Sequence, residues 1–387
     1  MKNYCFQYGF HGVGHGLFWT GKLNGLNIVY DCGSRSSQVL KTSINNYTPS
    51  HIEILIISHF HQDHVKGVKE LFSKKTCGTI FIPYYHPDAL KYIELNYVFN
   101  LILENKMPTD SDKDYLLFLN SPSEYLFKFT NAEKIITIFP SENRLDDNYS
   151  SLLISYDSLS SEQSMLDNSI INITYQNRRN CTWLLKFFNL PYSNNIKVKE
   201  YVDRLKKRGI NTWEDMLNIT TQDLVMHILK TFNMDNSLSS TERNFTSLAV
   251  SIIPEGPCPT PSGIMLTGDL ELNRDPKQQL FLNHYKSELP QIAFFQYPHH
   301  GSNDNMPNTI SLSTFSPTTE WIISKKHISP NSSLPDIIAK NNFAYEIVTE
   351  KLSLVYSKYL CDSRVHKFTT SPNDSNFTFP ISFLKQP

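Results

Sequence analysis

His59-Phe60-His61-Gln62-Asp63-His64 follows directly on the apolar run Ile54-Leu55-Ile56-Ile57 and places four potential metal ligands within six positions. Side chains alternate along an extended segment, so His59 and His61 can converge on one ion. Asp63 and His64 then face a second ion. Imidazole and carboxylate together suit zinc, and also manganese or iron, and two neighbouring ions suit hydrolysis by a bridging hydroxide. The pattern predicts a dinuclear metal-dependent hydrolase, whereas the alternative is a polar turn with solvated histidines.

The composition excludes several classes of protein. The 387 residues carry a formal net charge of −1, so any binding to nucleic acid or an anionic membrane must be local. The six cysteines are scattered without a Cys-x-x-Cys pair, and the amino terminus lacks the apolar core of a signal peptide. No apolar run approaches the roughly 18 residues that cross a bilayer. We therefore expect a reduced, cytoplasmic protein with no membrane partner.

The patterning along the chain predicts a layered α/β fold. A strand, a helix and a second strand are expected at residues 52–57, 65–73 and 77–84. Other strands are predicted at 27–30, 134–139, 151–156, 247–253 and 264–266, and other helices at 198–208 and 213–232. We expect a single domain over residues 1–387. It would carry a helical, basic insert at about 160–240 and a polar tail from about 370.

Two later segments supply further ligands. Leu266-Thr267-Gly268-Asp269 ends an apolar strand in a glycine turn, and Asp269 is predicted to bridge two ions and to act in catalysis with Asp63 and His64. The segment from Phe294 to Ser302 is again a strand that ends in imidazoles. His299 or His300 is expected to complete the second ion's ligands. For both segments the alternative is an ordinary solvated turn.

These motifs resemble the metallo-β-lactamase superfamily, whose signature is His-x-His-x-Asp-His at the end of a strand. The resemblance implies an αββα sandwich and one or two divalent ions, zinc or else manganese. The family's Pro-x-His pattern selects His300 and leaves His299 as a supporting or substrate-facing group. Asp31 matches a position that usually orients a motif histidine, although a simple turn aspartate is the alternative. The implied ligand set is His59, His61, Asp63, His64, Asp269 and His300.

A narrower resemblance is to the hydrolase domain of the bacterial DNA-uptake channel protein ComEC and its stand-alone soluble relatives. It covers roughly residues 5–85 and 243–350. The first matching element usually reads Val-Gly-Gln-Gly-Asp in that family. His15 and Leu17 stand at two of its positions here, so no role is predicted for them. The segments that carry the resemblance are Val13-Gly14-His15-Gly16, Asp31-Cys32-Gly33, Leu266-Thr267-Gly268-Asp269 and His299-His300-Gly301-Ser302.

The superfamily's usual third histidine for the first ion has no clear counterpart. Between the His-rich motif and Asp269 the chain holds only His86 and His227, and both are interpreted as structural or solvated. The ComEC-like branch has Asn-x-x-Ser at this place, and the segment from Asn244 to Ser247 matches it. Asn244 is therefore expected to support the site. The first ion would have few ligands, which allows one tightly held ion or a second ion recruited with the substrate.

The predicted insert combines basic and aromatic residues, which together can follow a phosphate backbone and stack bases. Aromatic residues Trp183, Phe187 and Phe188 lie among the basic ones. The alternative is a solvated helix face over a small core. The basic residues expected to contact substrate are Arg178, Arg179, Lys206, Lys207 and Arg208.

We predict a metal-dependent phosphodiesterase or nuclease that uses a metal-activated water, with nucleic acid or a nucleotide as its bound partner. No pattern identifies a protein partner. One alternative is hydrolysis of another ester, such as a thioester, a lactone or a cyclic nucleotide, which a narrow apolar pocket would favour over an open basic groove. The other is a catalytically silent sensor or scaffold in a multi-protein system such as phage defence.

Overall fold

The computed structural model describes most of the chain, and the statements below concern those residues only. The described residues are 5–23, 25–141, 152–174, 182–190, 196–218, 247–255, 261–273, 276–303, 305–306, 314–325, 335, 338, 344–359 and 365–370.

The first sheet carries the His-rich motif. The strands β3, β4, β5, β6 and β8 run parallel, so their carboxyl ends lie at one edge, and the motif follows the carboxyl end of β4. Ligand sites in α/β sheets gather at that edge. Among the described residues this sheet has nine strands, in the spatial order β17 (Val365–Thr370), β16 (Ser353–Tyr359), β1 (Cys5–Phe10), β2 (Phe18–Leu23), β3 (Leu26–Cys32), β4 (His51–Ile56), β5 (Thr76–Pro83), β6 (Lys134–Phe139) and β8 (Glu162–Leu166).

The second sheet repeats this arrangement. Strands β12 to β15 run parallel, while β11 pairs with β12 in the predicted antiparallel hairpin. Asp269 follows β12, and His299 and His300 follow β13. In the described part of the chain this sheet has eight strands, in the order β15 (Tyr345–Val348), β14 (Glu320–Ser324), β13 (Ile292–Gln296), β12 (Gly263–Leu266), β11 (Ala249–Pro254), β10 (Thr182–Phe188), β9 (Ser169–Thr174) and β7 (Leu152–Ser155).

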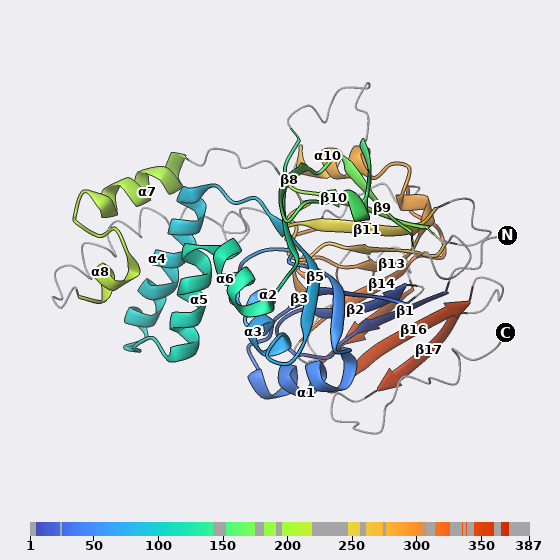
Figure 1. Cartoon of the computed structure of the whole chain (residues 1–387), viewed down its shortest axis with the longest axis horizontal. Coiled ribbons are helices and arrows are strands. Elements are labelled where there is room, and N and C mark those ends of the chain that lie inside the picture. Colours follow the sequence, from blue (N-terminus) through green and yellow to red (C-terminus); the bar gives the residue numbers. More distant parts are fainter. Residues whose placement is uncertain are drawn as a thin grey trace.

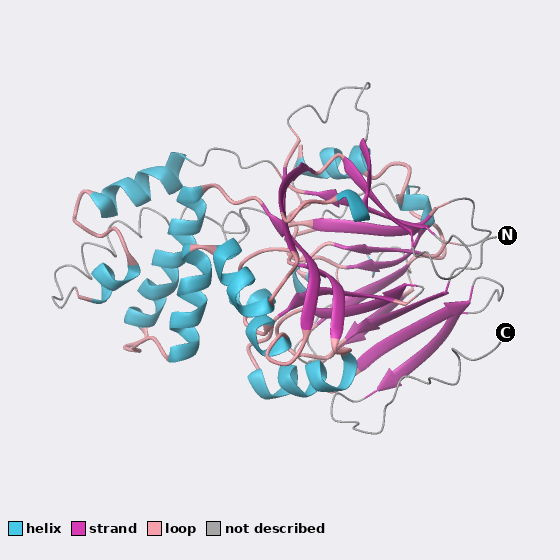
Figure 2. Cartoon of the chain, in the orientation of Figure 1, coloured by secondary structure: helices cyan, strands magenta, loops and turns pink. Residues whose placement is uncertain are grey.

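The two sheets pack face to face between helices (Figures 1 and 2). One apolar cluster holds side chains from both sheets, among them Trp19, Trp183 and Ile322. A second cluster joins the first sheet to α1 (Ser37–Tyr47), α3 (Val68–Leu71) and the helices beyond, and a third joins the second sheet to α10 (Lys277–His284). Central strands such as β11 and β12 are buried on both faces, and their sequences are nearly continuous apolar runs. The predicted αββα sandwich is confirmed.

Helices project from one side of the sandwich (Figure 1). The sequence analysis left α4 (Pro87–Leu103), α5 (Asp110–Asn120) and α6 (Pro122–Thr130) unassigned. Their start signals are present, since Pro87 opens α4 and a capping box joins Thr109 to Asp112 at the start of α5. The same group contains α7 (Ile196–Lys206) and α8 (Trp213–Leu217), and α7 packs on α4.

The prediction of a helical insert from about residue 160 is wrong over its first part. Strands β8, β9 and β10 occupy most of residues 162–188 and belong to the sandwich. Trp183, Phe187 and Phe188 are buried in the apolar clusters, so they do not form a stacking surface. Residues 219–246, which include most of the second predicted helix, lie outside the described residues, as does the tail from 371.

No helix among the described residues is both long and apolar enough to cross a membrane. The short helix α2 (Gln62–Val65) begins inside the His-rich motif itself, with His61 as its N-cap.

The backbone at Gly33 lies directly against the His-rich motif. A Cβ at this position would stand 2.2 Å from the carbonyl carbon of Asp63 and 2.3 Å from the amide nitrogen of His64. We expect Gly33→Ala to displace α2, to lower the free energy of unfolding by about 1–3 kcal/mol and to weaken metal binding. Chemical denaturation and metal titration measure the two effects. Ser37→Ala, at an exposed position in α1, is the control, and a Gly33→Ala variant with unchanged stability would contradict this packing.

Candidate metal centre

Asp31 anchors the start and the end of the His-rich motif through hydrogen bonds to Ser58 and His64. Its Oδ1 accepts a hydrogen bond from the Ser58 amide at 2.7 Å, and its Oδ2 accepts from the Ser58 hydroxyl at 2.6 Å. The same Oδ2 lies 2.7 Å from His64 Nδ1. Asp31 is fully buried and adopts a φ of 54°, a conformation that costs a non-glycine residue about 1–3 kcal/mol. This placement suits the predicted orienting role, because the imidazole of His64 is anchored at Nδ1 and presents Nε2 to the site.

Two tyrosines fix the backbone between the two outer motif histidines. The hydroxyl of Tyr85 accepts a hydrogen bond from the Phe60 amide at 3.2 Å, and the hydroxyl of Tyr115, in α5, donates to the Phe60 carbonyl at 2.8 Å. Gln62 also reaches the helical group, since its side-chain amide donates to the Tyr97 hydroxyl at 2.7 Å. The helices α4 and α5 therefore help to position the motif.

Asp269 lies between histidines of the first sheet. Its Oδ2 is 3.6 Å from His59 Nε2, and its Oδ1 is 3.4 Å from His64 Nε2. His61 stacks edge-on against His59, with 4.7 Å between ring centroids. Each oxygen of this one carboxylate thus faces a different imidazole, which is the arrangement that a bridging ligand requires.

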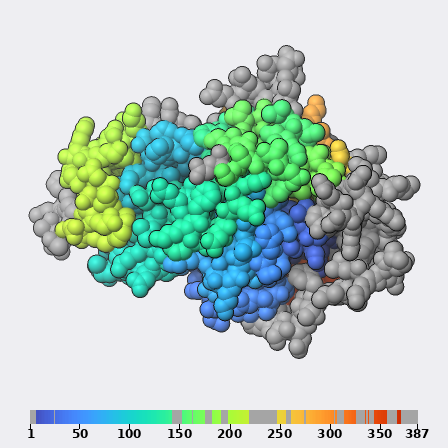
Figure 3. Space-filling view, in the orientation of Figure 1, coloured from blue at the N-terminus to red at the C-terminus, as the bar shows by residue number. Residues whose placement is uncertain are grey.

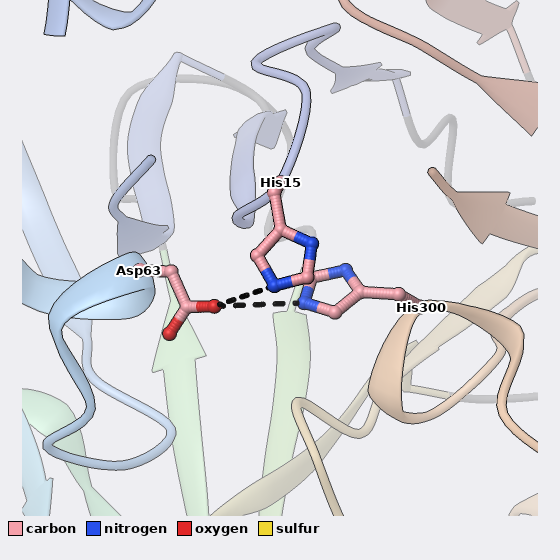
Figure 4. A group of neighbouring side chains, drawn as sticks. All are labelled: His15, Asp63 and His300. Atoms are coloured by element: carbon pink, nitrogen blue, oxygen red, sulfur yellow. Dashed lines mark ion pairs between the residues drawn. The ribbon is translucent and has the colours of Figure 1, made fainter. Parts of the chain in front are cut away.

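The second half of the centre surrounds Asp63 (Figure 4). Its Oδ2 lies 4.0 Å from His300 Nε2 and 3.4 Å from His15 Nε2. His15 and His300 come from loops that are far apart in the sequence, and their rings lie 4.9 Å apart. The sequence analysis assigned no role to His15. Its signal was the glycine-flanked His11-Gly12-Val13-Gly14-His15-Gly16, in which the positive φ of Gly14 shapes the loop.

Adjacent His299 and His300 point to different carboxylates. His300 faces Asp63, whereas His299 Nε2 lies 3.7 Å from Asp269 Oδ2. Both residues have a positive φ, 47° for His299 and 54° for His300. The strained backbone turns two neighbouring side chains toward two separate positions.

The donor set fits a pair of divalent ions. The Nε2 atoms of His59, His64 and His300 are buried and have no hydrogen-bond partner. Buried polar atoms normally have a partner, so these three require another explanation. Ligand atoms around a tetrahedral zinc lie about 3.3–3.4 Å apart. The separations of 3.4 to 4.0 Å between these nitrogens and the facing carboxylate oxygens are close to that spacing.

The electrostatics favour a cation. Burial and the nearby charge of His64 lower the pKa of His59 well below its usual value, and burial lowers the pKa of His300 to about 4. Burial lowers the pKa of His64 too, but Asp269 and Asp31 outweigh it and raise that pKa well above its usual value. Burial disfavours the Asp269 carboxylate, yet His64 and His59 hold its pKa well below the usual range. Metal binding would displace the proton from His64.

The described basic residues predicted to contact substrate are not among the residues that form the centre. His86 caps α4, which is consistent with the structural role expected for it, and Lys186 is buried in an ion pair with Glu288. Lys206, Lys207 and Arg208 are exposed at the end of α7, which lies with α8 at one end of the molecule (Figure 3). Outside the described residues lie Arg178, Arg179, His227 and Asn244.

Replacing Asp31 by Asn tests the orienting role. An Asn amide cannot accept from the Ser58 amide, the Ser58 hydroxyl and His64 Nδ1 together, so one hydrogen bond must reverse. If the amide donates to Nδ1, the proton of His64 moves to Nε2 and blocks metal binding. We expect zinc affinity to fall about 10–100-fold, as measured by competition with a chromophoric chelator. Asp114→Asn, on α5, is the control, and unchanged affinity in Asp31→Asn would leave Asp31 as an ordinary turn residue.

Three comparisons with known proteins found similar sequences or structures. Residues 19–119, which run from β2 to α5 and include the motif, match the family model described as metallo-beta-lactamase superfamily. A ribonuclease Z of Agathobacter rectalis is 44% identical over 50 residues, which are 13% of this chain and 16% of that protein's length. The crystal structure of the metallo-beta-lactamase fold protein YhfI from Bacillus subtilis covers 92% of this chain and 100% of its own, at 10% identity and a TM-score of 0.39. Residues 19–119 are thus similar to the metallo-β-lactamase superfamily, and the described residues have the two packed sheets that the resemblance implies.

Proposed function

We propose that this protein is a metal-dependent phosphodiesterase or nuclease. One observation carries the proposal: the Asp269 carboxylate lies between His59 and His64, whose buried Nε2 atoms have no hydrogen-bond partner. These residues would hold a divalent ion, which would supply activation of water and compensation of negative charge on a phosphoryl group. Zinc suits the histidine-rich ligand set, and manganese is the second candidate.

The residues of the chain have separable tasks. Asp31 fixes the tautomer of His64, and Asp269 faces both His59 and His64 in the first half of the centre. His15 and His299 are the more accessible imidazoles, with side chains 36% and 29% exposed, so they stand on the side that a substrate can reach. Asp63 faces His15 and His300 in the second half.

Four observations favour a phosphodiester over other esters. Burial lowers the pKa of His15, and the charge of exposed Arg35 lowers it further. A cation therefore lies beside the accessible edge of the site. The short similarity to a ribonuclease Z and the resemblance to the ComEC hydrolase domain point the same way. The exposed basic residues at the end of α7 would contact a long polyanion rather than a small one.

The first test pairs metal content with cleavage. We expect one to two ions per purified chain by mass spectrometry, and zinc- or manganese-dependent cleavage of DNA, RNA or bis-p-nitrophenyl phosphate. A variant with both Asp63→Ala and His64→Ala should lose the ions and the cleavage together, because it removes ligands from the centre.

The controls separate the alternatives. His51→Ala changes a histidine at the opposite end of β4 and should leave metal and activity unchanged. Bound ions without cleavage of any phosphodiester, cyclic nucleotides included, would contradict the proposal and favour a thioester or a lactone as substrate. Absence of both would favour a silent sensor or scaffold.

The α7 contribution is tested with long and short substrates. We expect the double variant Lys206→Glu and Lys207→Glu to weaken binding of single-stranded DNA or RNA and to reduce the slope of log affinity against log salt by about 0.7 per lost phosphate contact. Cleavage of bis-p-nitrophenyl phosphate should not change. Lys286→Glu, an exposed lysine next to α10, is the control. An unaltered salt slope would exclude α7 from substrate binding.

A further inference from the structure

The superfamily's usual third histidine for the first ion was not found in the sequence between the His-rich motif and Asp269. His59, His61 and Asp269 come together, but the usual third histidine has no equivalent among the described residues between the motif and Asp269. His86 caps α4 and does not face the centre. A zinc with three protein ligands is open to water, whereas a fourth would hold it more tightly.

His299 faces the position that the missing histidine would occupy. Its Nε2 lies 3.7 Å from Asp269 Oδ2, and His59 Nε2 lies 3.6 Å from that same oxygen. His64 faces the other oxygen, Oδ1, and His300 faces Asp63. His299 and His59 therefore face the same oxygen of Asp269. His59, His64 and Asp269 also offer ligand atoms that lie within 4.8 Å of one another.

A buried asparagine determines which nitrogen of His299 is free. The side-chain amide of Asn305 donates to the carbonyls of Asp269 and Leu270, at 3.1 and 3.4 Å, and carbonyls can only accept. Asn305 Oδ1 must then be the atom that lies 2.7 Å from His299 Nδ1, so Nδ1 carries the proton. The lone pair of His299 is thereby left on Nε2, which points to Asp269. Metal-binding histidines are held in this way.

The backbone supports the same orientation. The His299 amide donates to the Gly268 carbonyl at 3.0 Å, which ties the loop after β13 to the loop that carries Asp269. Asn305 makes a second tie between the same loops, because its side chain bonds to the Asp269 and Leu270 carbonyls. Both ties hold His299 beside Asp269 in a positive-φ conformation that a free loop would leave.

We propose that His299 is a protein ligand of the first ion, together with His59, His61 and Asp269, and that Asn305 is its positioning residue. The sequence analysis expected His300, or else His299, to complete the ligands of the second ion, whereas this assignment gives His299 to the first ion. It rests on the proposed metal dependence, but its test reads metal binding and not phosphodiester cleavage. If the protein does not cleave phosphodiesters, the measurement of metal affinity still decides whether His299 is a ligand.

A mutant cycle on metal affinity tests the assignment. Zinc affinities of the full chain are measured by chelator competition for His61→Ala, His299→Ala, His300→Ala and the doubles that pair His299→Ala with each of the others. We expect His299→Ala to weaken one of two ions at least about 10-fold. Its effect should not add to that of His61→Ala, because both act on the same ion, and should add to that of His300→Ala.

The proposal is overturned if the effect of His299→Ala adds to that of His61→Ala but not to that of His300→Ala. It is also overturned if the His299→Ala protein binds both ions with unchanged affinity. Because the His299 side chain is partly exposed, its truncation should leave the fold intact, and circular dichroism checks this. His51→Ala is the matched histidine control. For Asn305, substitution by Leu should weaken the same ion about 10–100-fold, while Asp, which keeps an acceptor for Nδ1, should restore part of the affinity. Equal affinities in both Asn305 variants would exclude the positioning role.

Discussion

The buried carboxylate of Asp269 is the constraint on which the rest of the centre depends. It stands at the carboxyl end of β12, in the second sheet, and faces His59 and His64, which follow β4 in the first. A charge at such depth is stable only when opposite charge surrounds it. His64, whose pKa is raised well above its usual value, supplies that charge while it carries a proton, and a divalent ion would supply it when it does not. The two sheets therefore meet at an electrostatic contact as well as at the apolar core between them.

Hydrogen bonds from surrounding residues fix the positions of the groups that make this contact. Asp31 anchors His64, Asn305 anchors His299, and the hydroxyls of Tyr85 and Tyr115 hold the backbone at Phe60. None of these groups faces the two carboxylates of the centre directly. Each removes a freedom of rotation or translation from a residue that does, which is how metal sites keep their ligands in place before the ion binds.

The strands leading into the centre were predictable because their signals are local. Apolar runs followed by polar turns determine β4, β12 and β13, and the spacing of the His-rich motif follows from the strand's alternation. Helix α4 was not recognised because its buried residues occur on several faces, since α5 packs on one side and α7 and α8 on another. The basic composition near residue 186 suggested a helical surface. Lys186 is instead buried and pairs with Glu288, a contact between residues far apart in the chain.

By itself the sequence determined which residue types follow which strands, and from these it predicted a site for divalent ions and a resemblance to the metallo-β-lactamase superfamily. Only the tertiary structure decided which of those residues face Asp269 and which face Asp63. His299 and His300 are neighbours in the chain, yet positive φ values and the Asn305 side chain send one toward Asp269 and the other toward Asp63. His15 joins Asp63 from the first loop of the chain. Such pairings depend on where separate loops meet in space, because a side chain's neighbours across two sheets are set by packing and not by spacing along the chain.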